Sequence, residues 1–410
     1  MKNKNYTGFL WHAIFLSLTT TFTDVNTIIP SLILNVGGSA IHVGIVSAIV
    51  IGLPVVTKLF FSSFLSAQER KKPYLLLGIN LRIISLISIA MTLIWYKNLS
   101  FILILMLLYV ELFIFSVGGA FASLPYIYLL GTFKKETRIR FFTRRPMISS
   151  IGMLLSVISA RFILSRWEYP TQYVILFILS ATSLFIASFG FRMITERTID
   201  PVPKQPIGTI LRGIPHLLSH DKNFFTFIIY SNIMGSALAL IPFYIAYAKN
   251  QFTVDSTMLG YILFVQIIGM FLASFIFPKI IKKNGFKGVL ALRIVIHTGL
   301  PLLALFVAKR GSLLSYLSVF FIVGFALSAR AASEDAALIE LTDEKNRVLY
   351  SALAGTLNIA IIIFPFILGL LITKQGYFIV FLLSSLITIG AFPVLKSLQC
   401  PVDKKKLRAR

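Results

Sequence analysis

The chain has 410 residues, of which 57% are hydrophobic and 13% charged, and its mean hydropathy is +0.86. A soluble protein of this composition could not cover its surface with polar groups, so the composition excludes a soluble enzyme and indicates an integral membrane protein. Lys and Arg number 39 against 15 Asp and Glu, a net charge of +24. These basic residues lie in short clusters between long apolar runs, which argues against a nucleic-acid-binding domain. The single cysteine, Cys400, excludes an intrachain disulfide and a cysteine-rich metal site.

Twelve apolar runs follow one another along the chain, and a helix of roughly 20 such residues crosses a bilayer. They lie at about residues 9–33, 41–65, 73–96, 99–130, 146–164, 171–191, 223–248, 257–278, 288–308, 312–339, 348–373 and 375–395. The runs are rich in Leu, Ile, Val and Phe and lack the two-residue alternation of barrel strands. We therefore predict an all-α integral membrane protein with twelve transmembrane helices. We expect the first run to stay in the mature chain, because it is longer than the apolar part of a signal peptide and no small-residue cleavage site follows it.

The distribution of Lys and Arg predicts the orientation of these spans. With both termini inside, 28 of the 39 basic residues lie in inner segments, as the excess of positive charge in cytoplasmic loops requires. We therefore expect a multi-pass protein of the cytoplasmic (inner) membrane with both termini in the cytoplasm. The inner basic clusters are then expected to face anionic lipid headgroups.

The longest polar stretch lies between the sixth and seventh predicted spans, so it divides the chain into two halves of six spans each. It covers residues 192–222 and contains Pro201, Pro203, Pro206 and Pro215. We predict an N-terminal six-helix bundle at 1–191, a cytoplasmic linker at 192–222, a C-terminal six-helix bundle at 223–395 and a basic cytoplasmic tail at 396–410.

The two predicted halves also repeat each other weakly. Ile29-Pro30 corresponds to Ile241-Pro242 at an offset of 212 residues, and Arg82 corresponds to Arg293 at an offset of 211. The stretch that begins at Tyr173 corresponds to the one that begins at Tyr377 at an offset of 204. Matches in chain order with slowly drifting offsets argue for a duplicated six-helix unit.

A loop motif joins the second and third spans of the second half. It reads Pro-Lys-Ile-Ile-Lys-Lys-Asn-Gly-Phe-Lys at residues 278–287. Lys283, Gly285 and Lys287 match the pattern G-x-x-x-D-R/K-x-G-R/K-R/K of the major facilitator superfamily. The first-half loop keeps only the basic end of the pattern and has Ala67 in place of its Asp. Over nearly its whole length, the chain resembles this superfamily.

The resemblance implies two pseudo-symmetric six-helix bundles around a central cavity that opens alternately to the two sides of the membrane. Because the loops are short, function is expected to depend on polar groups inside the spans. The resemblance also implies that Lys283, Gly285 and Lys287 belong to an inner gate.

Three charged side chains within the predicted spans are candidates for coupling or substrate binding, because a charge at bilayer depth is costly unless it is paired or hydrated. They are Asp24, Glu111 and Arg82. Either acid could carry a proton or bind a cationic group. The structural alternatives are that Asp24 braces the kink at Pro30 and that Glu111 forms a fixed pair with Arg82.

Several other polar residues in the spans complete the set of candidates. The uncharged ones could bind substrate or bridge helices: Asn26, Asn232, Gln266 and Asn358. Arg330, Glu334 and Asp335 fall at i, i+4 and i+5, which suits an inner-gate latch or, alternatively, a solvated helix end. Arg293 and His297 lie in the ninth span, where we favour a packing role for the arginine.

These features predict a secondary active transporter that moves a small molecule by alternating access and is coupled to a proton or another ion. The chain lacks the G-x-x-x-x-G-K-S/T loop of an ATP-driven pump, and scattered single charges differ from the filter of a channel. A membrane-embedded enzyme acting on lipid-linked substrates and a transporter-like sensor that does not transport remain as alternatives. We expect no enzyme activity, no cofactor or metal, no nucleic-acid partner and a monomer. The substrate and the direction of transport stay open.

Overall fold

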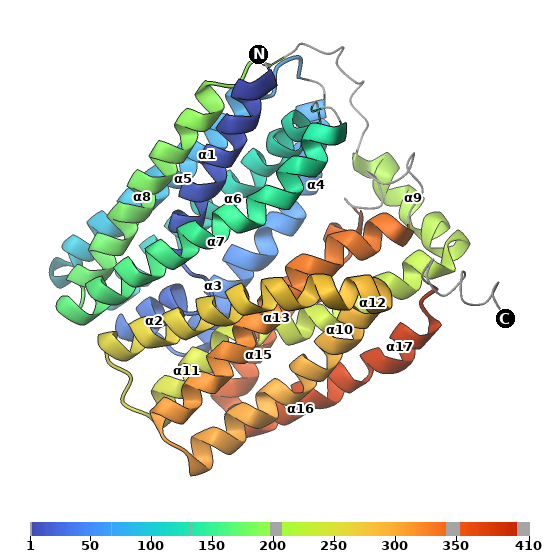
Figure 1. The fold of residues 1–410 in the computed structure, drawn as a ribbon. Coiled ribbons are helices and arrows are strands. Elements are labelled where there is room, and N and C mark those ends of the chain that lie inside the picture. The colour runs from blue at the N-terminus through green and yellow to red at the C-terminus, as the bar shows by residue number, and fades with distance from the viewer. Residues whose placement is uncertain are drawn as a thin grey trace. The chain divides into compact units, whose positions relative to one another are not determined.

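The computed structural model describes residues 2–66, 68–131, 133, 135–196, 207–341 and 353–399. Regular structure within these ranges is helical, which confirms the predicted all-α fold (Figure 1). The first half contains α1 (Lys2–Phe22), α2 (Ile28–Asn35), α3 (Ala40–Ser47), α4 (Leu53–Ser66), α5 (Lys72–Ile94), α6 (Phe101–Gly131), α7 (Lys135–Arg166) and α8 (Thr171–Arg192). The rest contains α9 (Ile207–His220), α10 (Lys222–Ala239), α11 (Ile241–Gln251), α12 (Ser256–Arg310), α13 (Leu313–Leu341), α15 (Ala360–Gln375), α16 (Tyr377–Ile389) and α17 (Ala391–Ser397).

Eleven helical segments within the described residues are long and apolar enough to cross a membrane, and they match the second to twelfth predicted spans. The segment predicted at 9–33 is interrupted, because α1 ends at Phe22 and α2 begins at Ile28. The chain is therefore a multi-pass membrane protein. The first span differs from the others because residues Thr23–Thr27 interrupt its helix.

Two further helices deviate from regular α geometry. The second span contains a π-helical stretch at Ala48–Gly52 between α3 and α4. The long helix α12 bends at Gly285, whose φ of 66° lies in the left-handed region that glycine adopts without steric cost. The bend separates two predicted spans and shows why the loop motif has a glycine at this position.

Contacts divide the chain into two compact units. The first unit comprises Met1–Ser39, Ile49–Ile207 and Asp255–Phe264, and the second comprises Ala40–Ala48, Gly208–Val254 and Val265–Arg410. The first part of the second span thus belongs to the second unit, and the first part of the eighth span belongs to the first unit. The bundle boundaries at 1–191 and 223–395 remain a prediction.

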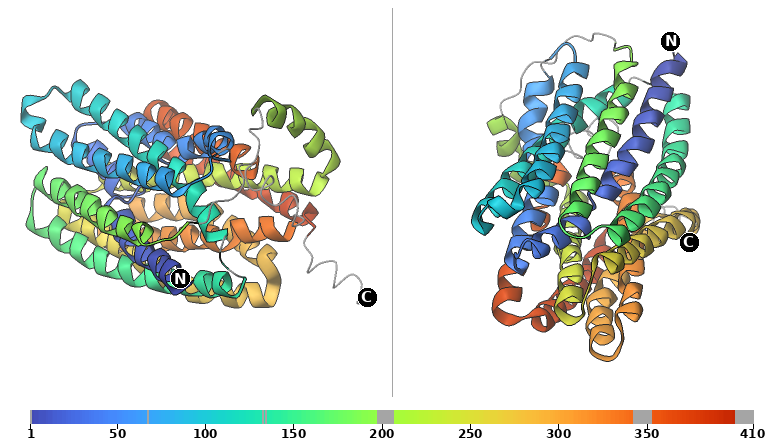
Figure 2. Two further views of the ribbon diagram at one scale, coloured as in Figure 1. Left: turned by 90° about the horizontal axis from the view of Figure 1, so that it is seen from above. Right: turned by 90° about the vertical axis from the view of Figure 1, so that its left-hand side faces the viewer.

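In the first unit, α1 packs against α7 and α8, while α5 packs against α6 and α8 (Figures 1 and 2). Two glycine pairs let these helices approach closely. A Cβ added at Gly8 would meet the carbonyl oxygen of Gly190, and a Cβ at Gly78 would lie 2.6 Å from the carbonyl oxygen of Gly118. Small residues at helix contacts are the usual means of close packing in membranes.

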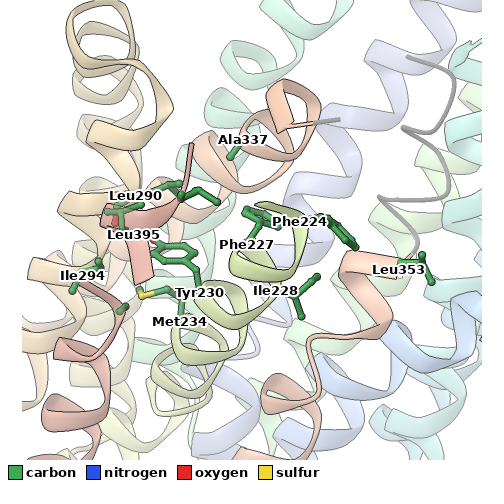
Figure 3. Close-up of a cluster of buried hydrophobic side chains, with 12 residues drawn as sticks. Phe224, Phe227, Ile228, Tyr230, Met234, Leu290, Ile294, Ala337, Leu353 and Leu395 are labelled. Carbon is green, nitrogen blue, oxygen red and sulfur yellow. Dashed lines mark hydrogen bonds between the residues drawn. The ribbon is translucent and has the colours of Figure 1, made fainter. Parts of the chain in front are cut away.

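In the second unit, α10 contacts α15, α16 and α17. Its buried side chains form the core cluster shown in Figure 3, together with residues of α12, α13 and α17. Tyr230 lies in this cluster and donates a hydrogen bond of 2.9 Å to the carbonyl oxygen of Leu290. The helix α15 also packs against α3, where a Cβ at Gly369 would lie 2.8 Å from the carbonyl oxygen of Ala40.

Hydrogen bonds at corresponding positions in the two halves connect the first helix of each half to the end of its last helix. The Asn5 side chain donates to the Thr195 carbonyl and accepts from its N–H, both at 3.1 Å. In the second half, the Asn223 side chain makes the same pair of bonds with Gln399, at 3.0 and 2.9 Å. The ammonium groups of Lys72 and Lys287 likewise donate to the carbonyls of Ile194 and Leu398. Two matching sets of bonds fit a duplicated six-helix unit.

Candidate functional site

Glu111 of α6 is a buried carboxylate inside the first unit, with an exposed fraction of 5%. It lies roughly 15 Å along the helix from Phe101 at 1.5 Å per residue, about a third of the way through the span Phe101–Leu130. Ser88 and Thr92 of α5 donate hydrogen bonds to its Oε1 atom, at 2.6 and 2.8 Å. Its other oxygen, Oε2, is buried and accepts no hydrogen bond. The carboxyl group therefore has one satisfied oxygen and one oxygen without a donor.

Helical geometry brings these groups together. Ser85, Ser88 and Thr92 lie at i, i+3 and i+7 of α5, so they share the face that packs on α6. Ser85 donates a hydrogen bond of 2.5 Å to the backbone carbonyl of Glu111 and so fixes the position at which the carboxylate emerges. A serine and threonine stripe of this kind bridges two apolar helices by hydrogen bonds.

Arg82 lies one turn before this stripe and has a different neighbour. Its guanidinium carbon is 4.3 Å from the centre of the Phe115 ring, a cation–π arrangement. Gly118 and Gly119 leave room for its side chain, because Cβ atoms there would lie 3.1 and 3.6 Å from it. Both Arg82 and Glu111 are in the described part of the chain, and no ion pair joins them there. The structure therefore does not contain the fixed Glu111–Arg82 pair that the sequence suggested as an alternative. Glu111 accepts hydrogen bonds from two hydroxyl groups, and Arg82 lies over the Phe115 ring.

Asp24 lies in the break between α1 and α2. Its Oδ1 atom accepts hydrogen bonds from the Asn26 backbone N–H, at 3.0 Å, and from the Thr27 hydroxyl, at 2.8 Å. Asn26 is itself buried. The break leaves backbone donors that a helix would have paired, and the aspartate supplies an acceptor for one of them. This geometry corresponds to the bracing role, and Asp24 has a further partner as well.

Asn232 of α10 joins the seventh and eleventh spans. Its side-chain nitrogen donates to the carbonyls of Ile228 and Leu357, at 2.9 and 2.8 Å, and its oxygen accepts from the Ala360 N–H at 3.1 Å. The eleventh span is unwound at this point, since residues 357–359 separate its helical part at 353–356 from α15. Asn232 therefore satisfies backbone groups that the break exposes.

Asn358 lies in the same break and is buried, with an exposed fraction of 7%. Its Oδ1 atom accepts no hydrogen bond, and it lies against Gly235, where a Cβ would collide with it. Asn232 and Asn358 are thus brought together at one discontinuity within the second unit. Broken helices of this kind supply polar groups at membrane depth in many transporters.

The remaining interior candidates lie elsewhere. Gln266 is fully buried in α12, where its backbone carbonyl faces Gly324 of α13. Arg293 is also fully buried, and its Nη1 atom donates to the Ser333 hydroxyl of α13 at 3.5 Å. His297 is buried one turn further along the same helix. These contacts correspond to the packing role favoured for Arg293.

The inner-gate candidates are only partly described. Lys283 is exposed beside the bend at Gly285, and Lys287 is tied to Leu398 as stated above. Arg330 of α13 is half-buried. The side chains of Glu334 and Asp335, like residues 197–206, 342–352 and 400–410, lie outside the described residues. The latch of Arg330 with these acids remains a prediction.

Arg161 is not recognisable from the sequence as an interior charge, because it lies close to the end of its predicted span. In α7, its Nη2 atom donates a hydrogen bond of 2.7 Å to the Tyr261 hydroxyl, and its guanidinium carbon is 4.1 Å from the centre of that ring. Gly260 leaves room for the contact, because a Cβ there would lie 3.1 Å from the Arg161 Cα. An Arg followed a hundred residues later by Gly-Tyr carries no sequence signal for this contact.

Together, these features define a helical membrane protein whose spans hold a buried carboxylic acid and two polar discontinuities. The family described as MFS/sugar transport protein matches residues 32–347 of the chain. The chain belongs to this family, and it is therefore a membrane transporter with a small-molecule substrate rather than an enzyme.

Solved structures show the same fold. A mutant of the nucleoside transporter NupG is similar with a TM-score of 0.70 and 13% identity, covering 96% of this chain and 100% of that one. A mutant of the peptide transporter POT has a TM-score of 0.70 at 12% identity, with 97% and 96% covered. A bacterial homologue of the iron transporter ferroportin, in an inward-facing state, has a TM-score of 0.68 at 14% identity, with 97% and 99% covered. Among curated proteins, no significant match is found.

Proposed function

We propose that the protein is a proton-coupled secondary transporter of a small, hydroxyl-bearing solute, and that Glu111 carries the proton. The observation that supports this role is the asymmetry of the carboxyl group, with two donors on Oε1 and none on Oε2. A buried oxygen without a donor is costly in an apolar interior. A proton on Oε2 removes the charge while leaving both hydroxyl donors on Oε1 in place. The carboxyl group can therefore take up and release a proton without rebuilding its surroundings.

The solute class is inferred from the polar groups at the helix breaks. The amides of Asn26 and Asn358 are uncharged and offer both donors and acceptors, whereas the Asn232 side chain is already bonded to backbone groups of the seventh and eleventh spans. Such groups suit a neutral solute rich in hydroxyl groups, and the family description, which names sugar transport, points the same way. The nucleoside transporter NupG is one of the structural neighbours, so nucleosides belong to the same set of test solutes.

We further propose that transport uses alternating access and that the π-helical stretch Ala48–Gly52 is a hinge. The boundary between the two compact units falls at Ala48 and Ile49, at the start of this stretch. Single π-helical turns within α-helices are frequent at functional sites. Pro54 lies two residues after the stretch and lacks the backbone N–H that would bond back into it. A bend here would let α3 and α4 move separately.

The test uses purified protein in proteoliposomes with an imposed pH gradient and a panel of radiolabelled sugars and nucleosides. Wild-type protein is expected to accumulate at least one solute when the gradient is present. Glu111→Gln keeps an oxygen for Ser88 and Thr92 but cannot release a proton. It is expected to lose gradient-driven accumulation and to retain exchange of labelled for unlabelled solute.

The matched control is Glu168→Gln, which removes the charge of an exposed glutamate in the turn between α7 and α8. It should accumulate solute like the wild type. Full accumulation by Glu111→Gln would remove Glu111 from the coupling role. Binding of a solute by the wild type without any flux would instead identify a sensor.

A further inference from the structure

The linker helix α9 has one face committed to packing. Ile214, Leu217 and Leu218 pack against the core cluster of the second unit that contains Phe224 and Phe227. Figure 2 shows α9, in yellow-green, set at an angle to α10, which follows it directly. The apolar face of α9 is therefore covered by the core cluster, and the described residues on its other face are exposed.

Two histidines lie on the exposed side of this helix. His216 and His220 are both exposed and lie at positions i and i+4, so their side chains project from the same face one turn apart. Their ring centres are 5.4 Å apart and their ring planes are inclined by 13°. Neither ring is needed for packing or for the proton route proposed above.

We propose that His216 and His220 form a two-imidazole site for a divalent transition-metal ion such as Zn²⁺, Ni²⁺ or Cu²⁺. Imidazole nitrogen is a preferred ligand for these ions, and two histidines at i and i+4 of a helix are a recurrent half-site for zinc. An ion bound at about 2.1 Å to one nitrogen of each ring would lie about 3.2 Å from each ring centre. With ring centres 5.4 Å apart, the angle at the ion is then roughly 115°, close to the tetrahedral value that zinc prefers.

Both rings must change orientation to reach this geometry. The rings are nearly parallel, so each must turn about its side-chain bonds to direct a nitrogen at the ion. Both side chains are exposed and can do so without disturbing the core. Among the described residues, no group of three or more His, Cys, Asp or Glu side chains could hold a metal. Water molecules therefore complete the coordination of the ion.

A bound ion would stabilise the last turn of α9 and hence the start of α10. The side chain of Asp221 already caps that start by accepting the Phe224 N–H at 2.9 Å. The ion would thus strengthen the junction between the linker and the second unit. Because anything that binds only the folded state shifts the unfolding equilibrium, metal should raise the melting temperature of the protein.

The test measures Zn²⁺ binding to the full chain in detergent, purified with a tag that contains no histidine and titrated against a chromophoric chelator at pH 7.5. Wild-type protein is expected to bind one Zn²⁺ with an affinity that falls at least tenfold in His216→Ala and in His220→Ala. Saturating Zn²⁺ should raise the melting temperature of the wild type and leave that of both variants unchanged.

A rearranged variant tests the spacing. His216→Ala combined with Gly213→His keeps two exposed histidines on α9, but at i and i+7, about 10.5 Å apart along the axis and too far for one ion. A side chain fits at this glycine, since no atom lies within 4 Å of an added Cβ. This variant should bind as weakly as His216→Ala.

Several results would overturn the site. They are the absence of Zn²⁺ binding by the wild type, an affinity unchanged in the single variants, and wild-type affinity in the rearranged variant. Several weak ions per chain that are insensitive to all variants would mean an adventitious ion only. None of these results bears on transport, so the two proposals fail independently.

Discussion

Asp24 and Glu111 are both acids within predicted spans, yet their surroundings differ. Glu111 is held by hydroxyl donors from a neighbouring helix and has one oxygen left for a proton. Asp24 is held by its own chain, where its carboxylate closes the break between α1 and α2. The first arrangement tolerates a change of protonation, whereas the second depends on an acceptor at a fixed place.

Substitutions at Asp24 separate these two roles. Asp24→Asn keeps an oxygen that can accept from Asn26 and Thr27, so we expect its unfolding temperature to stay close to that of the wild type. Asp24→Ala removes the acceptor and should cost about 1 kcal/mol, as loss of a capping side chain does. Thermal unfolding in detergent measures both effects.

Transport assays on the same two proteins complete the comparison. If Asp24 carries protons, Asp24→Asn should lose gradient-driven accumulation despite normal stability. Normal accumulation by Asp24→Asn, together with a destabilised Asp24→Ala, would leave Asp24 with the bracing role alone.

At the residue scale, the sequence predicts which polar side chains are interior but not what they contact. Glu111 and Arg82 are recognisable because charges interrupt long apolar runs. Their partners depend on the rotation of α5 against α6, which the glycines at 78 and 118 help to set. The contact of Arg161 with Tyr261 joins residues 100 positions apart, so no local pattern in the sequence indicates it.

At the scale of the elements, close helix contacts limit which glycines can change. A Cβ at Gly44 of α3 would meet the backbone carbonyl of Pro365 in α15 and would lie 3.4 Å from the Cα of Gly369. Backbone atoms cannot move aside as the end of a side chain can. We expect Gly44→Ala to destabilise the protein by about 1 to 3 kcal/mol through overpacking.

Gly299→Ala is the matched control for this change, because Gly299 lies within α12 and no atom is within 4 Å of its added Cβ. Alanine favours a helix over glycine, so this variant should be as stable as the wild type or slightly more stable. Thermal unfolding of the purified variants compares them. Equal stability of the Gly44 and Gly299 variants would show that α3 and α15 are not packed as described.

The π-helical stretch allows a second test at this scale. Deleting Ile49 should convert Ala48–Gly52 into regular α-helix while keeping the helices on both sides in register, because a π-bulge arises from one extra residue. We expect a folded protein that binds solute and transports it more slowly. Deleting Val56 within α4 instead rotates the following residues by about 100° and should prevent folding.

Solute binding and transport rates, measured side by side, decide the role of the hinge. A deletion of Ile49 that transports at the wild-type rate would contradict the hinge. The sequence shows Gly52 and Pro54 near this point, but a π-helical turn depends on hydrogen bonding that no local motif specifies.

At the scale of the whole molecule, hydropathy predicts eleven of the spans closely and the first one less well. The first span is polar around Asp24, and its helix is broken there. The duplication is also visible in the sequence. The sequence does not indicate which segments form each compact unit, because α3 and residues 255–264 each cluster with the other half of the chain.

The proposed orientation can be tested with the protein's only cysteine. If both termini face the cytoplasm, Cys400 should react with a membrane-impermeant maleimide only after cells are permeabilised. A reporter at Asn98→Cys in a Cys400→Ser background lies at an exposed turn between α5 and α6 and should react in intact cells. If Cys400 reacted in intact cells and the reporter at position 98 reacted only after permeabilisation, both termini would lie outside the cytoplasm.

The proposed mechanism requires that solute and protons move together. Proteoliposomes that contain a pH-sensitive dye and no imposed gradient are given a solute that the wild type transports. We predict that the solute makes the wild type move protons in a fixed ratio to solute, and that Glu111→Gln exchanges solute without moving protons. Solute flux with no proton movement in the wild type, or equal proton movement in Glu111→Gln, would contradict the proposed mechanism.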